Sequence, residues 1–190
     1  MRRSWGVVAS VAWLALATTA VRADSWVDPL RGHLSFGYAK LFIPGAPGGS
    51  LSFSAGVDHP IASTVRAGID VDFNLLGTNT VDRGSLVADV DYSTIEVLAM
   101  VHWKPAWHFP LGRLSAGAGV MGARAAVNSS GAAEFQDLPV SDAAPALAAE
   151  ATFIGRSSAP VHVGLETGVH VGFVTDQPWT VWDLRLAIHY

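Results

Sequence analysis

The sequence predicts an all-β protein, an eight-stranded antiparallel up-and-down transmembrane β-barrel, and three observations support this prediction. Apolar and polar residues alternate with a period of two in eight runs, which is the pattern of strands that have two different faces. Only 15% of the 190 residues are charged and 50% are hydrophobic, whereas an average soluble domain has about 25% charged residues. The 19 glycines, and the lack of a long apolar run after residue 23, disfavour a bundle of membrane-spanning helices.

Residues 1–23 are predicted to be a signal peptide, followed by a single barrel domain over residues 24–190. Two arginines near the start precede an apolar stretch, and Val21 and Ala23 lie three and one residues before the expected cleavage point. The alternative is an uncleaved membrane anchor, for which the apolar stretch is short. We therefore expect the mature chain to begin at Asp24.

Composition excludes several classes of function. The chain has no cysteine, so disulfides, thiolate metal sites and cysteine nucleophiles are excluded. The formal net charge of −4 disfavours a nucleic-acid partner. No phosphate-binding loop, HExxH motif or EF-hand pattern occurs, and the sequence indicates neither a cofactor nor a metal site.

Eight strands are predicted, separated by clusters of Gly, Pro, Ser, Asn and Asp. In chain order they are residues 33–42, 51–58, 65–76, 92–103, 113–125, 144–154, 161–173 and 180–190. The third alternates from Val65 to Phe73, and the fourth and seventh are similarly regular. The fifth is rich in Gly and Ala, and the sixth contains Pro145, which is tolerated only at an edge or strand end. In the eighth, every second residue from Trp182 to Tyr190 is apolar or aromatic.

The composition of the two faces favours a barrel whose polar face points inward. A soluble barrel would carry many Lys and Glu residues outside, but the only lysines are Lys40 and Lys104. The polar face consists mainly of small residues with scattered charges, and the other face of aliphatic and aromatic residues, as a lipid-facing surface requires. Aromatic residues are predicted to form two girdles at the membrane interfaces. The external girdle is Phe42, Phe53, Phe73, Phe173 and Trp182, and the periplasmic girdle is Phe36, Trp103, Phe153 and Tyr190.

These features resemble a small outer-membrane β-barrel protein of the OmpA/OmpX type, and the resemblance covers residues 24–190. It rests on the leader, the eight runs and the last run, Trp182-Asp-Leu-Arg-Leu-Ala-Ile-His-Tyr190. It implies a location in the cell outer membrane, in contact with outer-membrane lipid and lipopolysaccharide. It also implies that the barrel-assembly machinery reads the apolar face of the last run as an assembly signal. The residues of this expected assembly signal are Trp182, Leu184, Leu186, Ile188 and Tyr190.

The polar face is expected to form a polar network that fills the lumen. An eight-stranded barrel has an interior just wide enough for side chains, and charges buried there must be paired. A proton-conducting water path is the alternative interpretation. The residues of the expected network are Arg66, Asp70, Asp72, Glu96, Glu150, Glu166, His170, Asp183 and Arg185. His162, Glu166, His170 and His189 would approach one another if the last two strands pair, which we interpret as a chance grouping rather than a metal site.

The longest gaps, residues 77–91 and 126–143, fall at odd-numbered connections and are predicted to be external loops. With the gap 174–179 they hold seven acids, Asp82, Asp89, Asp91, Glu134, Asp137, Asp142 and Asp176, against one arginine, Arg83. A solvated acidic surface is the simplest interpretation. The functional alternatives are divalent-cation bridges to lipopolysaccharide phosphates and recognition of a basic partner.

The expected function is a structural or surface-interaction role in the outer membrane, with no catalysis and with an external partner that the sequence does not identify. One alternative is a lipid A or lipopolysaccharide-modifying enzyme on the same barrel. Such an enzyme would need a serine activated by a histidine, and His33-Leu34-Ser35 resembles the His-x-Ser pair of lipid A deacylases. That pair lies in the first predicted strand, however, rather than late in the barrel. Another alternative is a soluble periplasmic lipocalin-like barrel that binds an apolar ligand.

Overall fold

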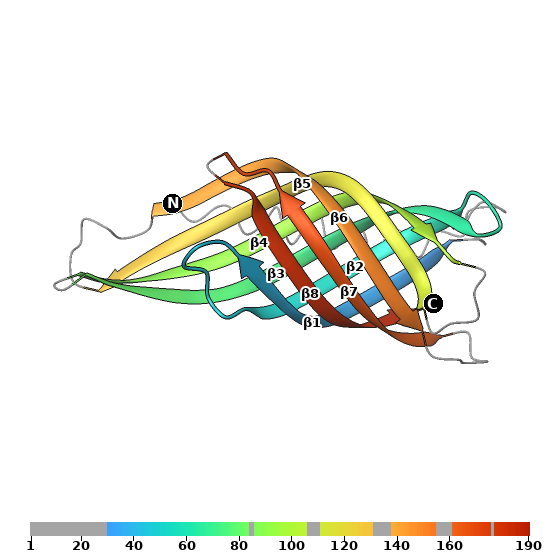
Figure 1. The fold of residues 1–190 in the computed structure, drawn as a ribbon, viewed down its shortest axis with the longest axis horizontal. Helices are drawn as coiled ribbons and strands as arrows, with labels where there is room; N and C mark the ends of the chain where they lie inside the picture. The colour runs from blue at the N-terminus through green and yellow to red at the C-terminus, as the bar shows by residue number, and fades with distance from the viewer. Residues whose placement is uncertain (1–29, 84–85, 106–110, 131–137, 155–160, 176) are drawn as a thin grey trace, which may run out of the picture. The chain divides into compact units, whose positions relative to one another are not determined.

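The computed structural model describes residues 30–83, 86–105, 111–130, 138–154, 161–175 and 177–190 (Figure 1). The predicted signal peptide, residues 1–23, lies outside the described residues, as do Glu134, Asp137 and Asp176.

Eight antiparallel strands form a closed barrel, as predicted, with each strand paired to the next and β8 paired to β1. The strands are β1 (Arg31–Phe42), β2 (Ser50–Pro60), β3 (Val65–Arg83), β4 (Leu86–Trp103), β5 (Leu111–Ser130), β6 (Leu138–Ile154), β7 (His162–Gly172) and β8 (Trp179–His189). Arg31 and Tyr190 lie at one end of the barrel, here called the terminal end. The opposite end, where β3 joins β4, is called the hairpin end (left in Figure 1). Within the described residues no helix is long and apolar enough to cross a membrane.

β3, β4, β5 and β6 are much longer than predicted, and β1 and β2 are longer by two or three residues. Most of 77–91 and 126–143, predicted as loops, is strand, because β3–β4 pairing continues to Arg83↔Leu86 and β4–β5 pairing to Val87↔Ser130. The pairs Thr78↔Asp91 and Thr80↔Asp89 are each joined by a hydroxyl–carboxylate hydrogen bond, so polar side chains stabilise one face of the longer ladder.

The strand segments beyond the rest of the barrel form what we call the projecting sheet. It comprises residues 77–83 of β3, 86–91 of β4, 126–130 of β5 and 138–143 of β6. It begins at a bulge in β3, where pairing shifts between Leu75 and Gly77. Gly77 has φ +92°, a conformation that L side chains rarely adopt, which explains a glycine there. In Figure 1 these strands reach past the rest of the barrel at its hairpin end.

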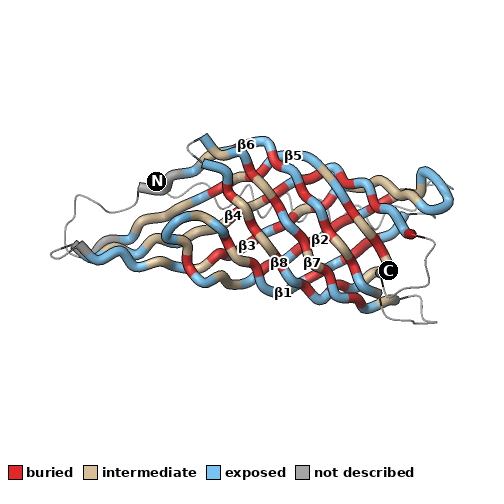
Figure 2. Tube along the Cα trace, in the orientation of Figure 1, coloured by how far each residue is buried: buried red, intermediate tan, exposed pale blue. Residues whose placement is uncertain are grey.

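Burial alternates along the strands with the predicted phase (Figure 2). In β7, for example, Val169 is 44% exposed on the outside, whereas Glu166 and His170 are fully buried inside. The exterior is formed by large exposed apolar side chains from all eight strands, which a water-soluble surface does not tolerate as one continuous band. This exterior is suited to lipid.

The predicted division of aromatic residues into two girdles is wrong for Phe36 and Phe53. These two residues are direct partners across β1 and β2, and Phe53 is in turn the partner of Phe73 on β3. All three are exposed and lie in one row on the outer surface. Neighbouring strands are staggered in a tilted barrel, so the distance of a residue from its strand end does not give its height in the membrane.

The interior is not uniformly polar. Apolar side chains form a cluster inside the barrel, and Leu41, Leu76 and Trp179 are members that lie near the hairpin end. Tyr92 contacts the Trp179 ring, with ring centroids 5.9 Å apart. The predicted polar network therefore shares the lumen with an apolar layer.

Candidate functional site: the charged lumen

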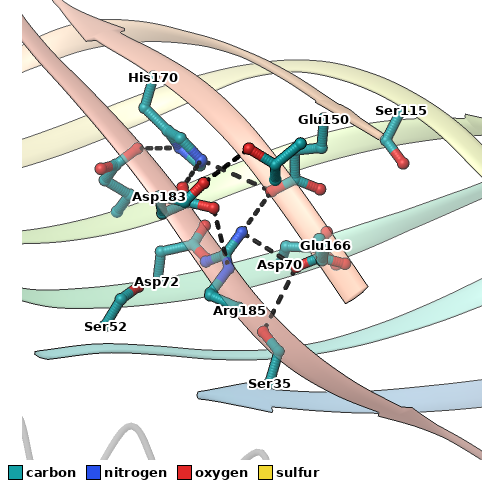
Figure 3. A network of polar contacts seen from close by, with 12 residues as sticks. Ser35, Ser52, Asp70, Asp72, Ser115, Glu150, Glu166, His170, Asp183 and Arg185 are labelled. Atoms are coloured by element: carbon teal, nitrogen blue, oxygen red, sulfur yellow. Dashed lines mark hydrogen bonds and ion pairs between the residues drawn. The ribbon is translucent and has the colours of Figure 1, made fainter. Parts of the chain in front are cut away.

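Arg185 is the centre of the charged lumen (Figure 3). Its guanidinium contacts four carboxylates from four different strands: Asp72 at short range, Glu150 at 2.8 Å, Glu166 at 3.1 Å and Asp183 at 3.2 Å. Arg185, Glu166 and Asp183 are almost fully buried. The planar fork of arginine can donate to several oxygens at once, which suits it to this position better than lysine.

His170 extends the same cluster from β7. Its Nδ1 lies 2.9 Å from Glu96, its Nε2 lies 2.9 Å from Asp183, and Nε2 is also 3.6 Å from Glu150 (Figure 3). Since both ring nitrogens face carboxylates, both can donate when the imidazole is protonated. The ring thus joins Glu96 on β4 to the carboxylates around Arg185.

A second arginine links this cluster to the terminal end. Arg113 lies 3.1 Å from Glu166 and 3.8 Å from Asp58, and Asp58 also pairs with Arg66 at short range. Arg66, predicted as a network residue, is only partly buried and binds both the carboxylate and the backbone carbonyl of Asp58. Arg113 and Asp58 were not among the predicted network residues, although Arg113 is in phase with Ser115, and Asp58 with Ser54, on the inward face of their strands.

Asp70 and three histidines lie apart from the Arg185 cluster. Asp70 Oδ2 is 3.8 Å from His33 Nε2, and the His33 ring centroid is 5.6 Å from that of His189 and 6.4 Å from that of His102. The group of His162, Glu166, His170 and His189 does not come together as one site. His162 is the strand partner of His189, whereas Glu166 and His170 belong to the Arg185 cluster.

The charges of the lumen are unbalanced. Among the described residues, seven acidic side chains are buried, against the two arginines Arg113 and Arg185. Atoms of Asp72, Glu150 and His170 lie within 4.8 Å of one another and are of the type that binds metal ions. Arg185 already contacts both Asp72 and Glu150, so its guanidinium takes the place that a cation would have there.

The serine–histidine pairs of the lumen lack the arrangement of a hydrolase. Ser35 donates to Glu166 at 3.4 Å rather than to His33, two residues away in the sequence. His102 Nδ1 and Ser115 Oγ lie 2.8 Å apart, but His102 Nε2 has no hydrogen-bond partner in the described part of the chain. A catalytic histidine is normally oriented by an acid on its second nitrogen.

The predicted assembly-signal residues lie on the outer face of β8 and just beyond it. Leu184, Leu186, Ile188 and Tyr190 are 37–50% exposed. Trp182 is half-buried, and its Nε1 donates a hydrogen bond to Thr167 Oγ1 at 3.0 Å. These five side chains form an apolar stripe next to the β8–β1 closure of the barrel.

A closed barrel with an apolar exterior and an ion-paired interior defines a transmembrane β-barrel. The sequence matches no protein-family model and no curated protein. The fold is similar to that of Ail, the attachment invasion locus protein of Yersinia pestis, solved with the heparin analogue sucrose octasulfate. The TM-score is 0.58 at 14% identity over 85% of this chain and 99% of that chain.

Two further solved structures are similar in the same way. Neisserial surface protein A has a TM-score of 0.57 at 16% identity, over 85% of this chain and 96% of that chain. A major outer membrane protein from Thermus thermophilus has a TM-score of 0.53 at 13% identity, over 85% of this chain and 98% of that chain. At these identities the likeness establishes the fold alone: this chain has the closed barrel fold of these small outer-membrane proteins.

Proposed function

We propose that this protein is a non-catalytic outer-membrane barrel whose projecting sheet is an interaction surface outside the cell. The observation that carries the proposal is the continuous strand pairing beyond the barrel wall. The pairing of β2 with β3 ends at Ser52↔Asn74, whereas β3 and β4 remain paired as far as Arg83↔Leu86. Paired backbone holds side chains in fixed positions, and such a preformed surface loses little conformational entropy when a partner binds.

The chemistry of the projecting sheet favours a basic partner. Asp82 and Asp89 are exposed, and Asp91 accepts hydrogen bonds from Thr78 and Asn128. At the base of the sheet, Asp142 accepts the Thr175 hydroxyl at 2.6 Å and the Thr175 N–H at 3.1 Å. These hydrogen bonds lower the pKa of Asp142, which keeps the carboxylate charged.

A cationic partner distinguishes this protein from its structural neighbour Ail, whose structure holds a sulfated, polyanionic ligand. Like charges across an interface disfavour binding, so four aspartates on the projecting sheet oppose a polyanion. We therefore favour a Lys- or Arg-rich protein surface as the partner. The competing ligands are divalent cations that bridge these aspartates to lipopolysaccharide phosphates. The variants described next test for them as well.

The test compares two variants of the purified, refolded barrel. Replacing Asp82, Asp89, Asp91 and Asp142 together with Asn should weaken binding of a fluorescent Lys-rich peptide and remove its salt dependence. The control, Thr78→Ala with Thr80→Ala, retains all four carboxylates and should keep most of the affinity. Equal binding by the wild type and the Asn variant would refute the acidic surface. Binding that needs added Ca²⁺ and lipopolysaccharide would instead favour the cation-bridge interpretation.

The absence of catalysis is tested separately. The best-formed serine–histidine pair, His102 and Ser115, lies inside the barrel, where a membrane lipid does not reach it, and both side chains are buried. We expect mass spectra of lipid A to be identical in cells with and without the protein. A new acylated or deacylated species that appears only with the wild-type protein would overturn this part of the proposal.

A further inference from the structure

Four side chains, three of them buried, converge in the lumen at the terminal end from four strands. They are His33 of β1, Asp70 of β3, His102 of β4 and His189 of β8, and we call them the histidine cluster. His33 is central: its ring centroid is 5.6 Å from that of His189 and 6.4 Å from that of His102, and its Nε2 is 3.8 Å from Asp70 Oδ2. His33, Asp70 and His102 are each about 1% exposed.

The ligand-type atoms of this cluster lack hydrogen-bond partners. Both ring nitrogens of His33, Nε2 of His102, Nε2 of His189 and both carboxylate oxygens of Asp70 are buried without one, as far as the chain is described. A buried polar atom left unpaired costs about 1–3 kcal/mol, so six of them in one place indicate a missing binding partner. Atoms of the Arg185 cluster also lack hydrogen bonds of good geometry, but its two cations lie at ion-pair distance from carboxylates: Arg185 Nε is 3.2 Å and His170 Nε2 is 2.9 Å from Asp183. In the histidine cluster the one such contact is the longer 3.8 Å approach of His33 to Asp70, as far as the chain is described.

His102 is already oriented as a metal ligand. Its Nδ1 lies 2.8 Å from Ser115 Oγ. When the hydroxyl accepts the Nδ1 proton, the lone pair of the neutral ring is on Nε2, the atom without a partner. Metal-binding histidines normally have this arrangement, in which the second nitrogen is held by an outer hydrogen bond.

Gly56 provides the space in which the cluster forms. It is the strand partner of both His33 and Asp70, between them on β2. A Cβ at this position would lie 2.0 Å from Asp70 Oδ1 and 2.4 Å from His33 Cε1. Any residue larger than glycine would therefore push apart the two side chains that approach each other most closely in the cluster.

The spacing of the rings also suits one ion. The charge of Arg113 acts on these rings and opposes a cation, but Arg113 is itself paired with Asp58 and Glu166. Zinc–nitrogen bonds of about 2.0–2.1 Å place two imidazole centroids on one tetrahedral ion about 5 Å apart. The centroid distances of 5.6 and 6.4 Å are close to this value. In the described part of the chain no three of these residues bring their ligand atoms within 4.8 Å of one another, so binding of an ion would have to draw the side chains together.

We infer that the histidine cluster binds one divalent transition-metal ion, of the class that prefers imidazole and carboxylate ligands, such as Zn²⁺. His33, His102 and His189 would supply nitrogen and Asp70 would supply oxygen. Ser115 is a positioning residue for His102. The ion would enter from the terminal end, where His189 and its strand partner His162 are only half-buried. This site is separate from the projecting sheet and does not depend on the role proposed for it.

The experiment is a titration of refolded, chelator-treated barrel with ZnCl₂ by calorimetry, with CoCl₂ as a spectroscopic probe. We expect one ion per chain, and visible absorption bands of tetrahedral Co²⁺ that Zn²⁺ displaces. His33→Gln and Asp70→Asn should weaken binding most. Ser115→Ala should weaken it roughly 10–100-fold, as removal of an outer-shell partner does. His59→Ala, on the outward-facing phase of β2, is the matched control and should bind as the wild type does.

The wild-type titration decides the matter even if a variant fails to fold. No stoichiometric uptake of Zn²⁺ by the wild type would overturn the inference. So would equal losses of affinity in His33→Gln and His59→Ala, since a histidine outside the cluster would then matter as much as its central member. A Co²⁺ spectrum that survives in Asp70→Asn and His33→Gln alike would place the ion elsewhere.

Discussion

Arg185 is the residue whose loss should disturb the lumen most, because four carboxylates depend on its positive charge. We predict that Arg185→Leu lowers the free energy of unfolding by about 3–5 kcal/mol, the usual cost of leaving buried charges without a partner. Urea unfolding of the refolded barrel measures this. Arg185→Lys keeps the charge but loses the planar fork, and its stability should fall between those of the wild type and the Leu variant. A loss under about 1 kcal/mol for the Leu variant would mean that other groups neutralise these acids.

Val169 tests the orientation of the outer face. It is 44% exposed and lies in the middle of β7. We predict that Val169→Arg costs roughly 2–4 kcal/mol in a bilayer, the range for a cation near the midplane of a barrel. Val87 is 37% exposed on the projecting sheet, where water is expected. Val87→Arg should therefore change stability by about 0.5 kcal/mol or less. Equal losses in the two variants would show that β7 does not face lipid.

At the scale of the element, β8 closes the barrel and remains the predicted assembly signal. Tyr190 exchanges two backbone hydrogen bonds of 3.0 Å with Gly32, while its side chain is 50% exposed. Tyr190→Ala keeps the backbone bonds and removes at most about 1–3 kcal/mol of apolar contact. We predict less protein inserted in cells but near-normal stability after refolding in detergent. Normal membrane levels would argue against recognition of Tyr190, and equal losses in both assays would make it an ordinary packing residue.

Where the alternation is regular, as in β7, the sequence was sufficient to predict which residues face inward, because a period of two leaves only two choices. The phase that puts Val169 outside and His170 inside is an example. Partners across strands depend on register and stagger, which no single strand encodes. Hence the sequence could not predict that Phe36 lies beside Phe53, that Asp58 pairs with Arg113, or that His33 and His102 lie close together.

The full length of β3, β4, β5 and β6 could not be predicted from the sequence either. Residues 77–91 contain Gly, Thr, Asn and Asp, which are typical of turns. Their strand conformation depends on cross-strand bonds such as Thr80 to Asp89, formed only when the register is correct. The register shift between Leu75 and Gly77 also changes the phase of the alternation, so a search with a constant period of two ends there.

For the barrel as a whole, closure predicts resistance to detergent. Every strand is hydrogen-bonded on both sides within the membrane-spanning part, and opening the barrel requires breaking a complete strand pairing. The refolded protein should therefore migrate differently on an SDS gel before and after boiling. Arg185→Leu should shift to the boiled position at a lower temperature than the wild type. A single band at all temperatures would be inconsistent with a stable closed barrel.

The mature protein is predicted to begin at Asp24. Val21 and Ala23 match the small residues that precede signal-peptide cleavage. N-terminal sequencing of protein from the outer-membrane fraction should read Asp-Ser-Trp from residue 24. Recovery of chains that begin at Met1 would instead indicate a retained anchor.

The projecting sheet leaves the protection of the closed barrel, and this has a consequence for self-association. The pairing of β6 with β7 begins at Ala146, so the earlier part of β6 is an edge strand whose backbone is available to another chain. Exposed edges of this kind promote strand-by-strand aggregation. Pro139 lies along this edge, and Pro145 lies where the edge begins, with its carbonyl accepting the Phe173 N–H at 2.9 Å. Proline has no N–H to donate to an added strand, so the two prolines disfavour association of this edge with a second copy of the chain.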